Sequence, residues 1–167
     1  MTRGAHLLEA ALTILAEQGP AALSVRTVAA AAGVSPAQVQ YYYRTKNDLV
    51  RAGYDYAGEQ FLVELAESDT LADMVRRWLP LDAHRERRAR VWLAYASTAA
   101  VDPVLAKESA AQDRELRGYF AERVGDRAAQ LLAMIDGVTL QCLTLPMKER
   151  QALVDRTLTP FLDGAKL

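Results

Sequence analysis

The stretch S-V-R-T-V-A-A-A-A-G-V-S-P-A-Q-V-Q-Y-Y-Y, residues 24–43, decides the fold of this chain. Ser24 is a typical N-cap, and the apolar positions after it keep helical spacing up to Gly33, a common residue at a helix end. Ser35 then caps another helix whose first position is Pro36, where the missing N–H costs nothing. The pattern predicts two short helices joined by a tight turn, which is the arrangement of a helix-turn-helix.

The composition around this stretch indicates one helical, globular molecule. The chain has 167 residues, 51% hydrophobic and 25% charged, and Ala and Leu contribute 30 and 23 of them. Both residues are strong helix formers, and no convincing strand pattern occurs. Without a run of 18 apolar residues or a signal peptide, we expect no membrane segment and a cytoplasmic protein. One cysteine and two distant histidines predict no disulfide, no metal and no cofactor.

Capping residues and Gly or Pro breaks divide the chain into about nine helices, the eighth capped by Asp126. We therefore predict an all-α fold with a three-helix helix-turn-helix domain at residues 1–45 and an antiparallel helical bundle at residues 46–167. The predicted helices cover approximately residues 2–18, 25–32, 36–42, 46–66, 70–79, 83–100, 103–125, 127–145 and 147–163.

The residues from Ala10 to Leu49 closely resemble the N-terminal domain of the TetR family of bacterial transcriptional regulators. The resemblance rests on L-A-E-Q-G, S-V-R-T-V-A-A-A-A-G-V-S and Y-Y-Y-R-T-K-N-D-L. The later segments W-L-A-Y-A, D-P-V-L-A and I-D-G-V-T-L-Q are similar to the regulatory domain of BetI-type repressors. The resemblance implies a homodimer that binds a palindromic operator in double-stranded DNA and is released by a small-molecule ligand.

The resemblance also implies which residues contact DNA. Gln38 is the leading candidate for base readout, because an amide can bond adenine N6 and N7 together. Tyr42 and Lys46 resemble the phosphate clamps of the family, and Gln40, where the family often has Tyr, is a second candidate base reader. The whole chain has a net charge of −1, but residues 20–51 have a net charge of +3. The full candidate set is Thr27, Ser35, Pro36, Ala37, Gln38, Gln40, Tyr41, Tyr42, Thr45 and Lys46.

Large apolar side chains on the middle helices are candidates for a ligand pocket, with ordinary core packing as the alternative. The six arginines between residues 76 and 90 are interpreted as a solvated face, and an anionic ligand or flanking DNA is the alternative. The candidate pocket residues are Met74, Trp78, Trp92, Tyr95, Tyr119, Phe120 and Met134.

The predicted helix at residues 127–145 is apolar on nearly every side, so every side of it must be buried. The resemblance assigns part of this surface to a dimer interface, and a central position within one subunit is the alternative. The candidate interface residues are Leu131, Ile135, Val138, Cys142, Val154, Leu158 and Phe161.

Two other functions remain open at this point. One is a DNA-binding regulator without a ligand, and the other is a helical interaction protein without affinity for DNA. An enzyme is not expected, because the sequence has no nucleophile with a nearby base, no paired carboxylates on an apolar face and no phosphate-binding Gly-rich loop.

Overall fold

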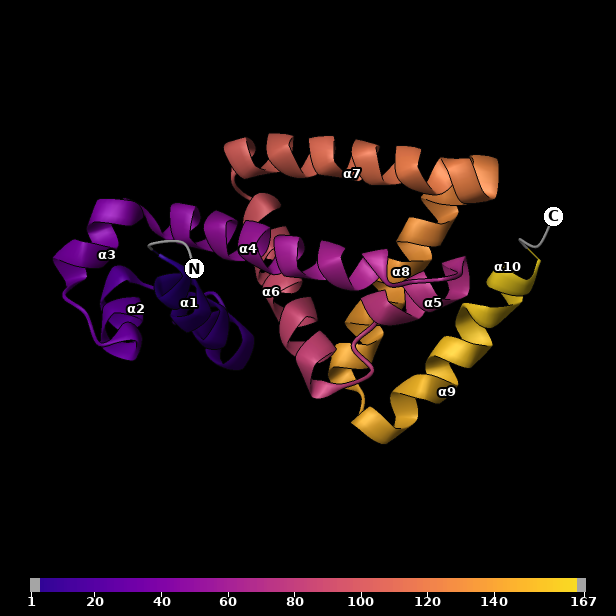
Figure 1. Cartoon of the computed structure of the whole chain (residues 1–167), viewed down its shortest axis with the longest axis horizontal. Coiled ribbons are helices and arrows are strands. Elements are labelled where there is room, and N and C mark those ends of the chain that lie inside the picture. The colour runs from indigo at the N-terminus through magenta and orange to yellow at the C-terminus, as the bar shows by residue number, and fades with distance from the viewer. Residues whose placement is uncertain (1–3, 165–167) are drawn as a thin grey trace.

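The computed structural model describes residues 4–164, and all regular structure in this range is helical (Figure 1). The predicted all-α fold, a helix-turn-helix domain followed by a helical bundle, is confirmed. The elements are α1 (Ala5–Gln18), α2 (Val25–Ala32), α3 (Pro36–Tyr42), α4 (Lys46–Ala66), α5 (Leu71–Trp78), α6 (Ala83–Ala99), α7 (Pro103–Val124), the 3-10 turn η1 (Gly125–Arg127), α8 (Ala128–Thr144), α9 (Met147–Thr157) and α10 (Thr159–Asp163).

Local hydrogen bonds fix the two helices of the helix-turn-helix where the sequence predicts them. The Ser24 hydroxyl accepts from the N–H of Thr27 at 3.1 Å, and the Thr27 hydroxyl accepts from the N–H of Ser24 at 2.9 Å. Gly33 ends α2 with a φ of 67°, a left-handed conformation that other residues rarely adopt. The Ser35 hydroxyl accepts from the N–H of Gln38 at 3.2 Å and caps α3.

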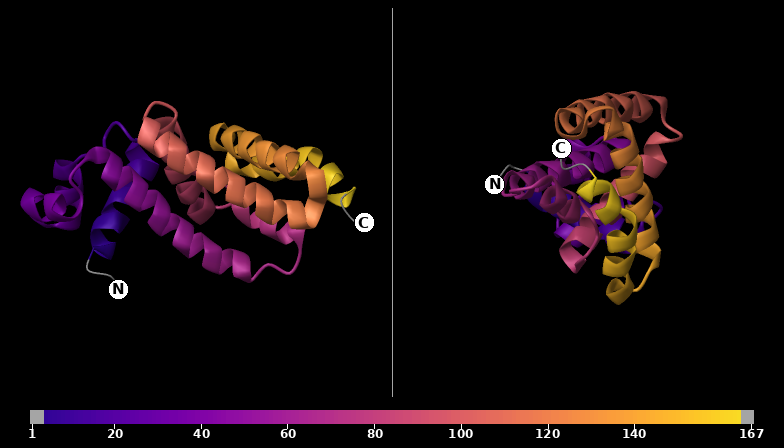
Figure 2. Two further views of the ribbon diagram at one scale, coloured as in Figure 1. Left: turned by 90° about the horizontal axis from the view of Figure 1, so that it is seen from above. Right: turned by 90° about the vertical axis from the view of Figure 1, so that its right-hand side faces the viewer.

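The molecule is elongated, with α1–α3 at one end and α8–α10 at the other, and α4 runs between the two ends (Figures 1 and 2). Two apolar clusters form the core. The first joins α1–α3 to α4 and α6, and the second joins α5, α7, α8 and α9. Because α4 packs against both α1 and α6, it connects the helix-turn-helix directly to the bundle. A domain boundary at residue 45 stays a prediction.

Two details of the predicted helix pattern are wrong. Asp126 does not cap the eighth helix, because it lies inside η1, and α8 begins at Ala128 without a side-chain cap. The single helix expected at residues 147–163 is divided into α9 and α10. Pro160 explains this break, since it has no N–H to donate to the preceding turn and its ring crowds that turn.

Among residues 4–164, no helix is long and apolar enough to cross a bilayer. The same range contains no group of three or more His, Cys, Asp and Glu side chains placed to hold a metal ion.

Candidate nucleic-acid interface and ligand cavity

The helix α3 lies at the outer end of the molecule (Figure 1). Its polar side chains are exposed. Val39 is fully buried in the first apolar cluster and anchors the helix, whereas Tyr41 is 82% exposed. Every one of the ten residues predicted to contact DNA is exposed, including those on α2 and at the start of α4. The fold therefore leaves all ten accessible to a partner.

The surface beside α3 is cationic. In the described part of the chain, Arg26, Arg44 and Lys46 make no ion pair, whereas Arg51 pairs with Glu108 on α7 at 2.9 Å. The carboxylate of Asp48 accepts from the N–H of Thr45 at 2.9 Å and is thus engaged in capping α4. Three free cations next to a helix N-terminus form a favourable environment for phosphate groups.

The three consecutive tyrosines have different environments. Tyr43 is half-buried against the first apolar cluster, and burial together with the neighbouring Tyr42 raises its pKa. Tyr41 and Tyr42 are exposed, and their rings meet edge to face with centroids 5.2 Å apart. Tyr43 is thus a packing residue, and Tyr41 and Tyr42 are free to meet a ligand.

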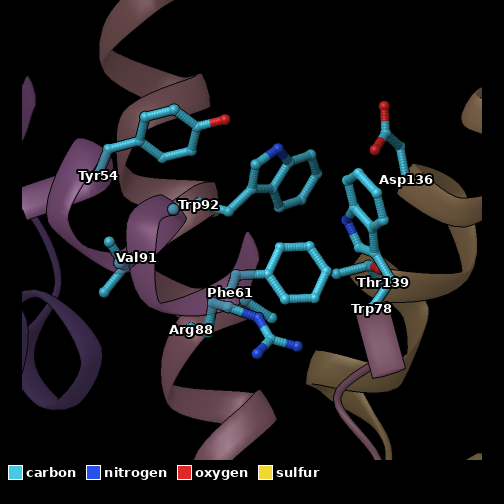
Figure 3. A pocket seen from close by; sticks show the side chains of 11 residues that line it. Tyr54, Phe61, Trp78, Arg88, Val91, Trp92, Asp136 and Thr139 are labelled. Carbon is cyan, nitrogen blue, oxygen red and sulfur yellow. The ribbon is translucent and has the colours of Figure 1, made fainter. Parts of the chain in front are cut away.

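A cavity of about 70 Å³ lies between α4, α5, α6 and α8 (Figure 3). An adjoining groove of about 430 Å³ shares four wall residues with it and extends between α6 and α7. The shared residues are Tyr54, Trp78, Trp92 and Asp136. The cavity and the groove together form an aromatic-walled site in the middle of the bundle, next to α4.

Three of the seven predicted pocket residues line this site, namely Trp78, Trp92 and Tyr95. The other four do not line the cavity or the groove. Met74 and Phe120 are buried in the second apolar cluster, Met134 packs against it, and Tyr119 points its hydroxyl to the sulfur of Met74 at 3.6 Å. Contact of any of the seven with a ligand stays a prediction.

The sequence reasoning missed nine of the eleven residues of the cavity wall, and five of these nine have aromatic or polar side chains. The α4 positions Tyr54 and Phe61 are seven residues apart and therefore share one helix face, a spacing that could have revealed them. Asp136 and Thr139 are three residues apart on α8, and Arg88 comes from α6. Nothing in the local sequence indicates that these three helices meet.

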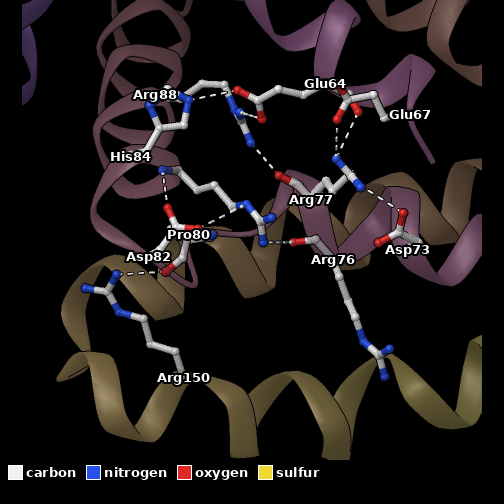
Figure 4. Close-up of polar contacts among 11 residues, drawn as sticks. Glu64, Glu67, Asp73, Arg76, Arg77, Pro80, Asp82, His84, Arg88 and Arg150 are labelled. Carbon is white, nitrogen blue, oxygen red and sulfur yellow. Dashed lines mark hydrogen bonds and ion pairs between the residues drawn. The ribbon is translucent and has the colours of Figure 1, made fainter.

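Arg88 is held in a fixed position at one side of the cavity (Figures 3 and 4). Its guanidinium contacts Glu64 at 2.8 Å, donates to the carbonyl of Arg77 and lies 4.0 Å from the centroid of the Phe61 ring. The side chain is only 13% exposed. Burial opposes ionisation of Glu64, but hydrogen bonds from His84 and Arg88 outweigh it and lower the pKa of this carboxyl.

The arginines between residues 76 and 90 lie on a partly exposed face, as the sequence suggested, but most of them are engaged in ion pairs. Five of the six pair with a carboxylate, and three of those carboxylates belong to other parts of the chain. Glu9 on α1 reaches Arg87 at 3.0 Å, and Glu64 and Glu67, near the end of α4, reach Arg88 and Arg77. The remaining pairs are Arg77–Asp73, Arg85–Asp82 and Arg90–Glu86.

The seven predicted dimer residues face the core of their own chain. Six of them are buried in the second apolar cluster, and Phe161 packs against that cluster with the guanidinium of Arg127 4.6 Å from its ring centroid. The inward face of α8 therefore corresponds to the alternative of a central helix. The six buried residues are Leu131, Ile135, Val138, Cys142, Val154 and Leu158.

An exposed recognition helix attached to a bundle with an internal cavity defines the class of helix-turn-helix transcriptional regulators. Comparison with known proteins agrees with the geometry. Residues 7–52 match the model of bacterial regulatory proteins of the tetR family, and residues 67–165 match the C-terminal domain of BetI-type transcriptional repressors. The chain belongs to the tetR family, whose members are transcriptional regulators rather than enzymes.

Curated relatives agree with this assignment. The HTH-type transcriptional repressor Rv3405c of Mycobacterium tuberculosis is 39% identical over 89 residues, which are 53% of this chain and 46% of the relative. The chain thus matches about half the length of that relative. The HTH-type transcriptional regulator BetI of Rhizobium meliloti is 26% identical, over 81% of this chain and 75% of that protein.

Solved structures extend the likeness to the whole fold. A transcriptional regulator from Rhodococcus sp. Rha1 has a TM-score of 0.85 and 30% identity, covering 99% of both chains. The multidrug binding protein EbrR, solved in complex with malachite green, has a TM-score of 0.73 and 26% identity over 97% of this chain and 99% of its own.

Proposed function

We propose that the protein is a repressor that binds a palindromic operator as a homodimer and leaves it when a small molecule enters the bundle. The observation that carries this proposal is the exposed polar face of α3, flanked by three cations without carboxylate partners in the described chain. The major groove of B-DNA is wide enough for one helix, so α3 can enter it without any rearrangement of its own packing.

Within the groove, Gln38 and Gln40 are the proposed base readers and Tyr41 the proposed apolar contact. Lys46 and Tyr42 flank α3 as phosphate contacts, and Lys46 adds its charge to the free N–H groups at the start of α4. The hydroxyls of Thr27 and Thr45 already serve as helix caps. We therefore assign these two threonines to the positioning of α2 and α4 beside the DNA.

The outer face of α8 supports the proposed dimer contact. Ala129, Ala133 and Leu140 are exposed on one side of this helix, and Leu140 is 49% exposed. Gly137 lies on the same side, and its missing side chain allows a second helix to approach closely. Two α8 helices in contact through this face would place the two α3 helices of a dimer in a fixed relation to each other.

The position of α4 supports control of DNA binding by a ligand. Its first turn carries Lys46 at the DNA-facing end, and its middle carries Tyr54 and Phe61 in the cavity wall. A ligand that widens the cavity would displace α4 and change the separation of the two recognition helices. EbrR, which shares this fold, has been solved with malachite green and with ethidium. These complexes support a ligand of organic, drug-like size.

One observation favours a regulator without a ligand as the second candidate. The cavity of about 70 Å³ is far smaller than the ~300–1,000 Å³ of ordinary ligand pockets. The adjoining groove of about 430 Å³ reaches the lower part of that range, so a ligand of ordinary size would have to occupy the groove as well as the cavity.

Selection of bound sequences from random double-stranded DNA tests the proposal. We expect a palindromic consensus and, for that DNA, a dissociation constant in the nanomolar range near physiological salt. If no preferred sequence is recovered, the protein is instead a helical interaction protein without specific affinity for DNA. Sequence-specific binding that no small molecule in a thermal-shift library affects would leave the regulator without a ligand.

A further inference from the structure

The charges around the cavity and its groove are compensated with one exception. Three of the wall residues are charged, namely Arg88, Asp113 and Asp136. Arg88 pairs with Glu64 at 2.8 Å, and Asp113 pairs with Arg117 at 2.7 Å. Asp136 forms no ion pair or hydrogen bond within the described chain. Asp136 is exposed where the cavity meets the groove, and its carboxylate is the one charge of the site without an ion-pair partner in the described chain.

Aromatic rings form the wall on one side of this carboxylate (Figure 3). Figure 3 shows Trp78, Trp92 and Tyr54 in the wall on the side of the cavity where Asp136 lies, and Arg88 on the opposite side. Tyr54 stacks on Tyr95 with ring centroids 4.1 Å apart, so the aromatic wall continues into the groove. The electron-rich faces of such rings attract organic cations, and tryptophan attracts them most strongly.

Two buried hydroxyls in the same walls lack hydrogen-bond partners. Thr139 is 4% exposed and lines the cavity, and Tyr95 is 3% exposed and lines the groove. The hydroxyl oxygen of each has no partner. Leaving a buried polar group without a partner is unfavourable, so polar atoms of a ligand or water would be favoured at both positions.

We propose that the ligand of this site is an organic monocation with an aromatic or bulky apolar body, whose positive charge is balanced by Asp136 and whose body is held by Trp78 and Trp92. This inference rests on the proposed ligand-responsive function and names the chemical class of the ligand. A neutral ligand would bring no positive charge to Asp136, and an anion would be repelled by its carboxylate.

The titration of Asp136 adds a pH dependence to this proposal. Asp136 is exposed at the mouth of the groove, but the surrounding protein partly removes its carboxyl from water, which raises its pKa to about 6, and the neighbouring charge of Asp113 contributes to this rise. Arg117 on α7 opposes it, and Tyr54 on α4, whose own pKa is raised to about 12, stays neutral. A bound cation favours the ionised carboxylate. Affinity for the cation is therefore highest well above pH 6, where the carboxyl is ionised, and it decreases as the pH falls through this value.

The two tryptophans of the chain, Trp78 and Trp92, both line the site, so their fluorescence reports directly on its occupation. The probes are phenyltrimethylammonium and tert-butylbenzene, which have the same shape and differ by one charge, and tetraphenylphosphonium and tetraphenylborate, which have opposite charges. At pH 7.5 we expect the full-length protein to bind each cation at least about tenfold more tightly than its matched probe, a difference of about 1.4 kcal/mol.

The variant Asp136→Asn removes the charge and keeps the shape of the side chain. We expect it to abolish the preference for the cations while the affinity for tert-butylbenzene stays within about twofold. Lowering the pH from 7.5 to 5 weakens binding of the cation about tenfold in the original protein, as expected for a carboxyl with a pKa of about 6, and has no such effect in the variant. The matched control is Asp126→Asn, an exposed aspartate in η1 outside the site, which retains the preference.

Equal binding of the cation and its matched probe overturns the proposal, and so does a preference that survives in Asp136→Asn or no binding of either cation. A thermal melt of each variant verifies that it is folded. These titrations contain no DNA, so they are independent of operator binding. If the protein binds an operator but shows no preference for cations, the proposed function stands and this inference is wrong. If the protein shows no sequence-specific DNA binding, the proposed function is wrong.

Discussion

Lys46 stands at the first position of α4, exposed and without a carboxylate partner in the described chain. A phosphate contact from this residue releases a counterion from DNA but reads no base. We expect Lys46→Ala to weaken binding to all DNA sequences by a similar factor and to reduce the slope of log K against log salt by about 1. Fluorescence anisotropy at several salt concentrations measures both quantities.

The matched control is Lys148→Ala, because Lys148 is equally exposed but lies on α9 at the other end of the molecule. Its salt dependence should equal that of the original protein. An unchanged slope for Lys46→Ala would remove this residue from the DNA contacts.

Local signals at single residues predicted the helix-turn-helix well. Ser24, Gly33 and Ser35 act within three or four positions of themselves, so their effects can be read from the neighbouring sequence. The predicted capping role of Asp126 is wrong because it depends on how two helices are connected and not on the neighbouring residues alone. Its capping role requires a free helix start, but η1 connects α7 to α8 without one.

At the scale of elements, Arg150 connects the start of α9 to the segment between α5 and α6. Its buried guanidinium donates to the carbonyls of Pro80 and Leu145 and pairs with Glu86 at 2.8 Å. The hydrogen bond from Arg150 holds the pKa of Glu86 below its usual range. The ion pair therefore stabilises the fold above the ordinary pKa of a glutamate, and this stabilisation is lost as the pH falls through the lowered value.

We expect Glu86→Gln to lower the free energy of unfolding by about 2 kcal/mol at pH 7, because the buried Arg150 guanidinium loses a charged hydrogen-bond partner that is itself partly exposed. Urea denaturation between pH 7 and pH 3 measures this difference, which should shrink towards zero as Glu86 becomes protonated in the original protein. A difference independent of pH would mean that the loss comes from packing and not from the charge.

Contacts between elements are where the sequence was least informative. Arg88 and Glu64 are 24 residues apart, and Arg87 and Glu9 are 78 apart. Counting the charges between residues 76 and 90 alone predicted an excess of positive charge. The carboxylates that balance part of this charge lie in α1 and near the end of α4. The cavity wall was only partly predicted for the same reason, since Tyr54, Arg88 and Asp136 come together through packing of three separate helices.

At the scale of the whole molecule, the two faces of α8 have different environments. The apolar pattern predicted a helix buried on every side, but α8 is buried on one side only within its own chain. The structure buries Ile135 and Cys142 internally and leaves Ala133 and Leu140 outside. Only the packing of α5, α7 and α9 around α8 separates the two sets.

We expect the original protein to be a dimer at micromolar concentration in sedimentation velocity. Ala133→Glu introduces two like charges facing each other across the proposed α8 contact and should yield a folded monomer. The control Ala121→Glu makes the same change at an exposed position of α7 and should remain a dimer. A monomeric original protein, or a dimeric Ala133→Glu variant, would contradict this interface.

The central claim is that α3 lies in the major groove with the Gln38 amide on an adenine. A double-mutant cycle on the selected operator tests it most directly, with each adenine of the half-site replaced in turn by 7-deazaadenine, which lacks the N7 acceptor. For one adenine, we expect the original protein to lose about 1–3 kcal/mol of binding free energy and the Gln38→Ala variant to lose nothing further. If every replacement were harmless, or if the variant lost as much as the original protein, α3 would not read the operator in this way.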